Sequence, residues 1–210
     1  MEKKRFFSAK EITGIAVLLA LVIVLQAVGG SISIGVVTLN FTLIPIVLGA
    51  ILYGPLVGGL LGFACGVVVL VQVIFGTGFY AVIWANSPVV TILTCIVKTT
   101  VAGIVSGYVY KLLKKKNDYV ALFVASGLVP VVNTALFIVG CLCMNQAILI
   151  FQSDLGALEG YTHVLGMNPL VFILVILVTF NFFFEFAINL IVAPALHRAI
   201  GVIQKVYKRK

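Results

Sequence analysis

Apolar residues occur in long runs along this chain, and polar residues are concentrated in the short segments between the runs. A membrane-spanning helix needs about 20 mostly apolar residues, because each residue adds about 1.5 Å along the helix axis. The runs therefore predict an all-α membrane protein, a bundle of six transmembrane helices. Their expected ranges are 11–28, 36–53, 55–75, 88–113, 119–150 and 169–197. Residues 1–210 are expected to form a single integral membrane domain.

Two boundaries have a local sequence signal. Gly54 and Pro55 interrupt one apolar block and predict a tight turn between the second and third helices. The segment GGSISIGVVTLN, which precedes the second helix, contains glycines and alternating β-branched residues. This pattern predicts an extended loop that dips toward the membrane rather than a regular helix start.

Charge distribution predicts the orientation in the membrane. The chain is 62% hydrophobic and 10% charged, with a formal net charge of +8. The basic residues gather at the N-terminus, in the loop 111–118 and at the C-terminus, and basic loops prefer the cytoplasmic side. Both termini are therefore expected to be cytoplasmic, with outer loops at 29–40, 76–87 and 152–168. Clusters of this kind, without a basic face, argue against nucleic-acid binding.

The cysteine pattern gives no reason to expect a metal or another cofactor. Four cysteines lie inside apolar runs and lack the CxxC spacing or histidine partners of a zinc site or redox pair. They are interpreted as small buried hydrophobic residues.

A few polar residues interrupt the predicted spanning helices at a similar depth. Counting along the helices places Lys98, Asn133, Asn181 and Glu185 roughly 18 to 24 Å from the inner surface. Asn181, Glu185 and Asn189 are spaced four residues apart and share one helix face. A charge in the bilayer interior is costly unless it faces the bundle and has a partner. Lys98 and Glu185 either form a structural ion pair or help to line a substrate cavity.

The second outer loop supplies aromatic candidates for the same site. Tyr80, Trp84 and Asn86 combine flat rings with an amide, a mixture that suits a partly aromatic or heterocyclic ligand. The alternative is an aromatic belt at the membrane surface, where Trp and Tyr are enriched.

Small residues recur at helical spacing on three predicted helices. In the third and fourth helices the glycines of GGLLGFACG and GIVSG favour close packing between helices. In the first helix, Ala16 and Ala20 lie on a face that also carries Thr13 and Ala27, and this face suits the docking of a separate subunit.

The chain resembles the substrate-binding S components of energy-coupling factor (ECF) transporters. The resemblance rests on the AxxxA pair in the first helix, the extended outer loop, the block FTLIPIVLGAILYGPLVGGLLGF and the closing NFFFEFAINLIVAPAL. It implies a binding subunit that captures a vitamin or related micronutrient from outside at a prokaryotic plasma membrane. It also implies docking through Ala16 and Ala20 on a transmembrane coupling protein that works with two ABC ATPases.

The residues narrow the function further. No ATPase site is expected, because CIVKTT around Lys98 lacks the glycines of a phosphate loop. The buried cation, the asparagines and the aromatic loop suit pantothenate, riboflavin and folate alike. Pantothenate is slightly preferred because of the single cation and because of the resemblance to S components. An enzyme is not expected, and a membrane-embedded transferase is the weaker alternative because catalytic clusters are absent from the sequence. The other alternative is a structural protein of cell-wall or shape assembly.

Overall fold

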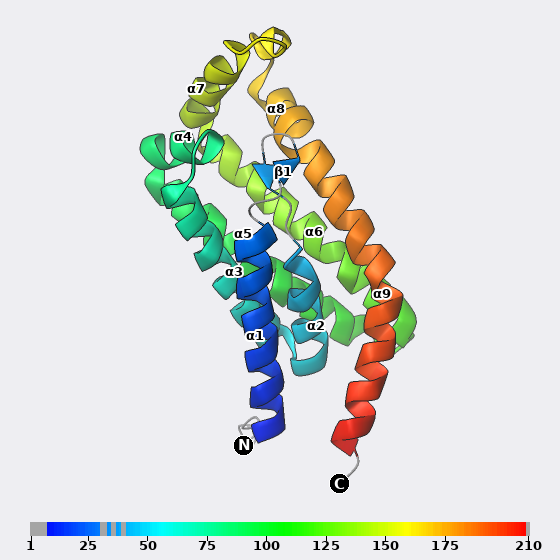
Figure 1. The fold of residues 1–210 in the computed structure, drawn as a ribbon. Helices are drawn as coiled ribbons and strands as arrows, with labels where there is room; N and C mark the ends of the chain where they lie inside the picture. The colour runs from blue at the N-terminus through cyan, green and yellow to red at the C-terminus, as the bar shows by residue number, and fades with distance from the viewer. Residues whose placement is uncertain (1–7, 30–32, 35–36, 39–40, 209–210) are drawn as a thin grey trace.

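The computed structural model describes residues 8–29, 33–34, 37–38 and 41–208, and these residues form an elongated helical bundle (Figure 1). The long helices are α1 (Ala9–Gly29), α3 (Pro55–Phe75), α5 (Pro88–Leu113), α6 (Asp118–Cys143) and α9 (Thr179–Lys208). The short elements are α2 (Leu43–Tyr53), α4 (Phe79–Asn86), α7 (Asn145–Gly156), the 3-10 turn η1 (Thr162–Val164), α8 (Pro169–Phe172) and the π-helical segment η2 (Ile173–Val178).

The helical class that the sequence predicts is confirmed. Five helices are long and apolar enough to cross a membrane: α1, α3, α5, α6 and the continuous helix Pro169–Val202, which includes α8 and η2. The remaining predicted span, α2, has 11 residues and is therefore only about 17 Å long, shorter than the roughly 30 Å hydrocarbon layer.

The second helix begins later than the expected residue 36. It starts at Leu43, and the segment before it contains a short antiparallel hairpin of β1 (Ser33–Ile34) and β2 (Val37–Thr38). Alternating β-branched residues favour strands, so the extended character predicted for this loop is confirmed for its described residues.

The prediction of one continuous fifth helix is also wrong, because the structure has two helices there. It was expected over 119–150, but α6 ends at Cys143, and Met144 leaves helical geometry with φ −99° and ψ 32°. The chain then continues as the separate helix α7. Similarly, the outer loop expected at 76–87 contains α4. The apolar runs on either side of Met144 are long enough together for one helix, so composition did not locate this break.

Glycines allow α3 and α5 to pack with their backbones close together. A Cβ atom added at Gly62 would collide with the carbonyl oxygen of Thr99, and one added at Gly103 would collide with that of Gly58. The Thr99 hydroxyl donates a hydrogen bond of 2.7 Å to the Gly62 carbonyl across this contact. The predicted role of these glycines in internal packing is therefore confirmed.

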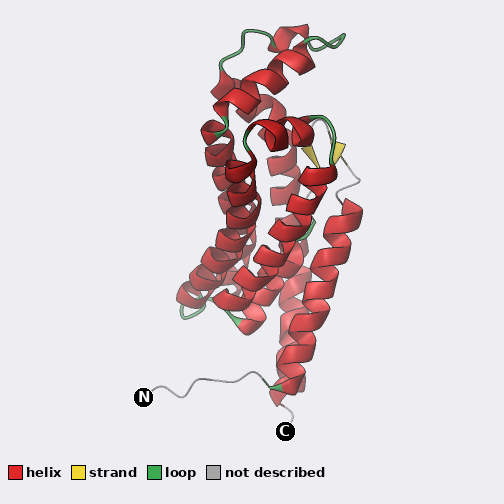
Figure 2. Ribbon diagram, turned by 90° about the vertical axis from the view of Figure 1, so that its left-hand side faces the viewer, coloured by secondary structure: helices red, strands yellow, loops and turns green. Residues whose placement is uncertain are grey.

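The two ends of the bundle differ. The start of α1 and the end of α9 lie at one end, whereas α4, α7 and the hairpin lie at the other (Figures 1 and 2). Near the first end, the Asp118 carboxylate accepts a 2.7 Å hydrogen bond from the Tyr110 hydroxyl and lies 3.4 Å from His197 Nε2. Asp118 thereby links α5, α6 and α9.

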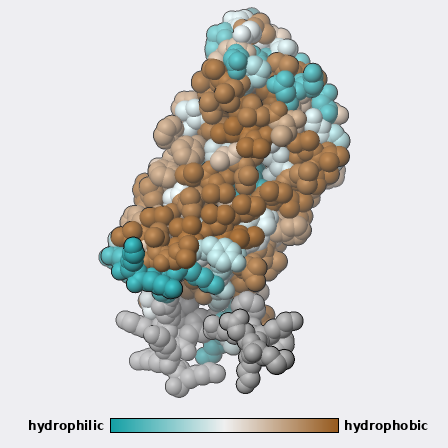
Figure 3. All heavy atoms as spheres, turned by 180° about the vertical axis from the view of Figure 1, so that it is seen from behind, coloured by the Kyte–Doolittle hydropathy of each residue, from teal (hydrophilic) through white to brown (hydrophobic). Residues whose placement is uncertain are grey.

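The outer surface is largely apolar. Figure 3 shows one face on which hydrophobic residues form a broad band and hydrophilic residues gather toward the two ends. Leu56, Phe75, Phe180 and Ile191 are each more than 70% exposed. An exposed apolar surface of this extent suits a hydrocarbon environment rather than water.

Candidate functional site

A cavity opens between the helices in the half of the bundle nearer α4. Its empty space is about 510 Å³, counting the part that opens to the surroundings. The helices α1, α4, α5, α6 and α9 each contribute polar side chains to its wall. These polar residues are Gln26, Tyr80, Lys98, Asn133, Thr134, Asn181 and Glu185.

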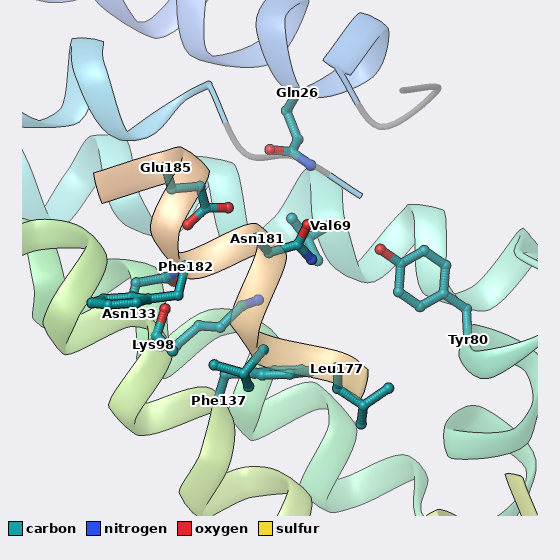
Figure 4. A pocket seen from close by; sticks show the side chains of 12 residues that line it. Gln26, Val69, Tyr80, Lys98, Asn133, Phe137, Leu177, Asn181, Phe182 and Glu185 are labelled. Carbon is teal, nitrogen blue, oxygen red and sulfur yellow. The ribbon is translucent and has the colours of Figure 1, made fainter. Parts of the chain in front are cut away.

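Five of the residues that the sequence singles out come together in this wall: Lys98, Asn133, Asn181, Glu185 and Tyr80. Figure 4 shows the amine of Lys98, the amide of Asn181, the carboxyl of Glu185 and the hydroxyl of Tyr80 arranged around a common space. The four residues that were predicted at a similar depth on separate helices are therefore close to one another in the fold.

The α9 residues reach the cavity from one face of the helix. Asn181 and Glu185, one turn apart, are both buried and line the cavity. Asn189, a further turn along, is also buried, but its amide donates a 2.8 Å hydrogen bond to the Glu185 carbonyl and does not line the cavity. Of these three residues on one face of α9, two line the cavity and the third is hydrogen-bonded within its own helix.

The π-helical segment η2 comes immediately before these residues. Its last two residues, Leu177 and Val178, line the cavity beside Asn181. The hydroxyl of Thr179 donates a 2.6 Å hydrogen bond to the Leu174 carbonyl, five residues back. Because a π-helical turn advances the side chains differently from an α-helical turn, it changes which residues of this continuous helix face the cavity.

Lys98 is the cation of the cavity. It lies near the middle of α5, and its Nζ atom is 5.0 Å from the centroid of the Phe137 ring. A cation over an aromatic face gains a modest electrostatic attraction. The ion pairs found within the described parts of the chain involve Asp118, and none joins Lys98 to Glu185.

Two amides of the wall have unused acceptors. The Oδ1 atoms of Asn133 and Asn181 are buried and accept no hydrogen bond from any described residue. Buried polar atoms are nearly always paired, and an exception calls for an explanation such as a ligand. Together with the Lys98 amine, these amides can hold a small polar molecule that carries an anionic group.

Gln26 is a wall residue that the sequence reasoning missed. Its amide donates a 2.9 Å hydrogen bond to Gln72 Oε1, and its Oε1 accepts a 3.3 Å hydrogen bond from the Thr42 hydroxyl. These contacts tie α1 to α3 and to the start of α2 at the cavity. The available signal was that Gln26 is the one polar side chain in the stretch 14–29 of α1.

Sequence comparison identifies the family of this cavity-forming bundle. The family described as "ECF transporter, substrate-specific component" matches residues 10–197, which is most of the chain. The chain belongs to this family. No curated protein matches the chain.

Membership defines the class of the protein. An ECF S component is a transporter subunit rather than an enzyme; it binds a small-molecule substrate and docks on an ECF module that contains ATPases. The family and the helices that are able to span a membrane together make this chain a multi-pass membrane protein.

The small-residue face of this S component points away from the bundle. Ala16 and Ala20 of α1 are exposed, whereas Leu18, Val22 and Gln26 of the same helix are buried. At 100° per residue, the two alanines lie on the side of α1 opposite these buried residues. The face is therefore accessible to another subunit.

Trp84 and Asn86 do not line the cavity. Trp84 is half-buried and packs against the hydrophobic core, and Asn86 is exposed with its amide donating a 2.9 Å hydrogen bond to the Val82 carbonyl. Tyr80 lies in the first turn of α4 and Trp84 one turn further along, and of the two rings only that of Tyr80 lines the cavity.

Proposed function

We propose that this S component captures a vitamin or related micronutrient, with the anion pantothenate preferred over riboflavin and folate. The observation that carries the proposal is Lys98, a cation near the middle of a membrane-spanning helix that forms no ion pair with any described residue. An uncompensated charge at this depth is costly, so an anionic group of the substrate is its natural partner.

The other wall residues supply contacts to the rest of the polar part of the substrate. Asn133 and Asn181 offer unused amide acceptors, so substrate amide or hydroxyl donors can bind to them. Glu185 adds a further acceptor group to the cavity wall, and Tyr80 adds a phenol from α4. In this proposal Lys98 and Glu185 line a binding site rather than form a structural pair.

We further propose that the chain crosses the membrane six times with both ends in the cytoplasm. In this arrangement, α2 and the β hairpin together provide the sixth crossing. The basic loop after α5 supports this orientation, because lysines favour the cytoplasmic side. The cavity then lies in the outer half of the membrane of a prokaryotic cell, beneath α4, α7 and the hairpin.

The exposed Ala16 and Ala20 face is proposed as the surface that docks on the transmembrane coupling protein, with two ABC ATPases attached to that protein. Small residues at this spacing let two helix backbones approach closely within lipid. The rest of the outward side of α1 carries large apolar residues such as Val17 and Val24, which suit contact with lipid.

The test of the binding proposal is equilibrium binding of radiolabelled pantothenate, riboflavin and folate to the purified protein and to Lys98→Gln. Loss of the charge is expected to raise the Kd at least about tenfold, which corresponds to about 1.4 kcal/mol. Lys111→Gln is the matched control, because Lys111 is an exposed lysine in the last turn of α5.

Loss of folding in Lys98→Gln, with no change in affinity for the folded fraction, would contradict the binding role and favour a structural one. Gel filtration and thermal unfolding of the same samples separate these outcomes.

A further inference from the structure

A second chamber lies beside the polar cavity. Its empty space is about 370 Å³, counting any part open to the surroundings, and its walls come from α3, α4, α5, α6 and Met144. Four residues border both spaces: Val69, Tyr80, Lys98 and Phe137. The two spaces are therefore neighbours with shared walls.

The second chamber presents a different chemistry from the first. Its own walls include Val73, Ile83 and Cys95, which are buried and offer little capacity for hydrogen bonding. The Thr91 hydroxyl is already engaged, because it donates to the Ile83 carbonyl at 3.1 Å and lies 3.2 Å from Met144 Sδ. Thr94 adds a second hydroxyl, but most of the other lining side chains are apolar, so a largely apolar group is the suitable occupant of such a chamber.

Lys98 stands at the junction of the two chambers. Its amine lies over the Phe137 ring, and both residues border both spaces. A substrate whose anionic group binds this amine can therefore extend into the polar cavity and into the apolar chamber.

The polar cavity also limits the charge of the substrate. The described residues of its wall include one cation, Lys98, and one carboxyl group, Glu185. A second anionic group placed beside Glu185 would have no cation of the described wall to compensate it, and like charges repel at this range.

We propose that the substrate is a monoanion whose uncharged arm carries an apolar branch, and that this branch occupies the second chamber. The inference rests on the proposed binding function and deepens it by defining the substrate class. Phosphate esters, dicarboxylates and uncharged molecules fall outside this class. Pantothenate falls within it, because it has one carboxylate and an uncharged arm whose dimethyl branch is apolar, while the hydroxyls and amide of that arm suit the polar cavity.

The test fills the second chamber from two sides. Val73→Phe on α3 and Ile83→Phe on α4 enlarge residues that border only this chamber. The matched control is Val124→Phe, because Val124 is exposed on the outer surface of α6. Equilibrium dialysis with radiolabelled pantothenate, riboflavin and folate gives the affinity of each purified variant.

The unmodified protein is expected to bind pantothenate, and both filling variants are expected to weaken this binding at least about tenfold while Val124→Phe leaves it unchanged. If a filling variant fails to fold, Val73→Ala serves instead. It removes contacts with the arm without crowding the chamber and is expected to weaken binding several-fold.

Binding of riboflavin or folate in place of pantothenate would overturn the inference, as would equal pantothenate affinity in the filling variants and the control. The proposed function would survive either result. If the unmodified protein binds none of the three molecules, the proposed function itself fails and the inference fails with it.

Discussion

At the residue scale, the polar groups of the cavity are side chains that are unfavourable when they face lipid. Lys98, Asn181 and Glu185 stand out in the sequence because they interrupt apolar runs, and lipid exposure of such groups is costly. Because of this cost, the three side chains face the interior of the bundle, where they meet at the cavity. Gln26 was missed because an amide near a helix end can also reach water, and only the positions of Gln72 and Thr42 show that it is held inside.

Asn181 provides a test that separates binding from stability. Asn181→Leu removes a buried carbonyl oxygen that accepts no hydrogen bond from the described residues. Because such a group is unfavourable when unpaired, the ligand-free variant is expected to unfold at the same temperature as the unmodified protein or higher. Substrate binding is expected to weaken, since the amide is lost from the cavity wall.

Thermal unfolding without substrate and equilibrium binding, on the same preparation, provide the two measurements. A lower unfolding temperature together with full affinity would show that Asn181 serves the fold and not the ligand.

At the scale of elements, the sequence located the spanning helices better than the breaks between them. Composition predicts α3 and α5 with their observed ends because Pro55 and Pro88 mark the helix starts. The break at Met144 has no proline or glycine beside it, and the two polar residues that follow, Asn145 and Gln146, also occur within helices. The π-helical turn of η2 likewise depends on hydrogen bonding along the backbone and has no periodic signature in the sequence.

The contact between α3 and α5 gives a prediction at this scale. Gly62→Ala places a methyl group against the carbonyl of Thr99, which is helix backbone and cannot turn aside. The helices must separate, and the hydrogen bond from the Thr99 hydroxyl to the Gly62 carbonyl must lengthen. A destabilisation of about 1–3 kcal/mol is expected, seen as a lower thermal unfolding temperature.

Gly201→Ala is the matched control for this substitution. Gly201 is helical, and an added Cβ there meets no atom within 4 Å. It is expected to leave stability unchanged or to raise it by up to about 1 kcal/mol. Equal unfolding temperatures for the two variants would refute the close-packing account.

At the scale of the whole molecule, the S component has two separate working surfaces. The cavity is enclosed by helices near α4, whereas the small-residue face of α1 points out of the bundle. The sequence predicts both surfaces. It could not predict which aromatic residues of 76–87 reach the cavity, because that depends on α4 and its placement.

The α1 face predicts a defect in assembly that leaves substrate binding intact. Ala16→Trp and Ala20→Trp place large rings where close helix approach is expected, so co-purification with the coupling protein and its ATPases should fall sharply. Ala187→Trp is the matched control, because Ala187 is an exposed alanine of α9 on a different surface. Unchanged co-purification in the α1 variants would rule out docking through this face.

The central claim is that the cavity around Lys98 binds an anionic micronutrient. The most direct measurement is mass spectrometry of small molecules released when the purified protein is denatured, with Lys98→Gln prepared in parallel. The account predicts one released species with a single anionic group and an uncharged arm, present with the unmodified protein and depleted in the variant. Release of no small molecule, or of a cation that the variant retains equally, would contradict it.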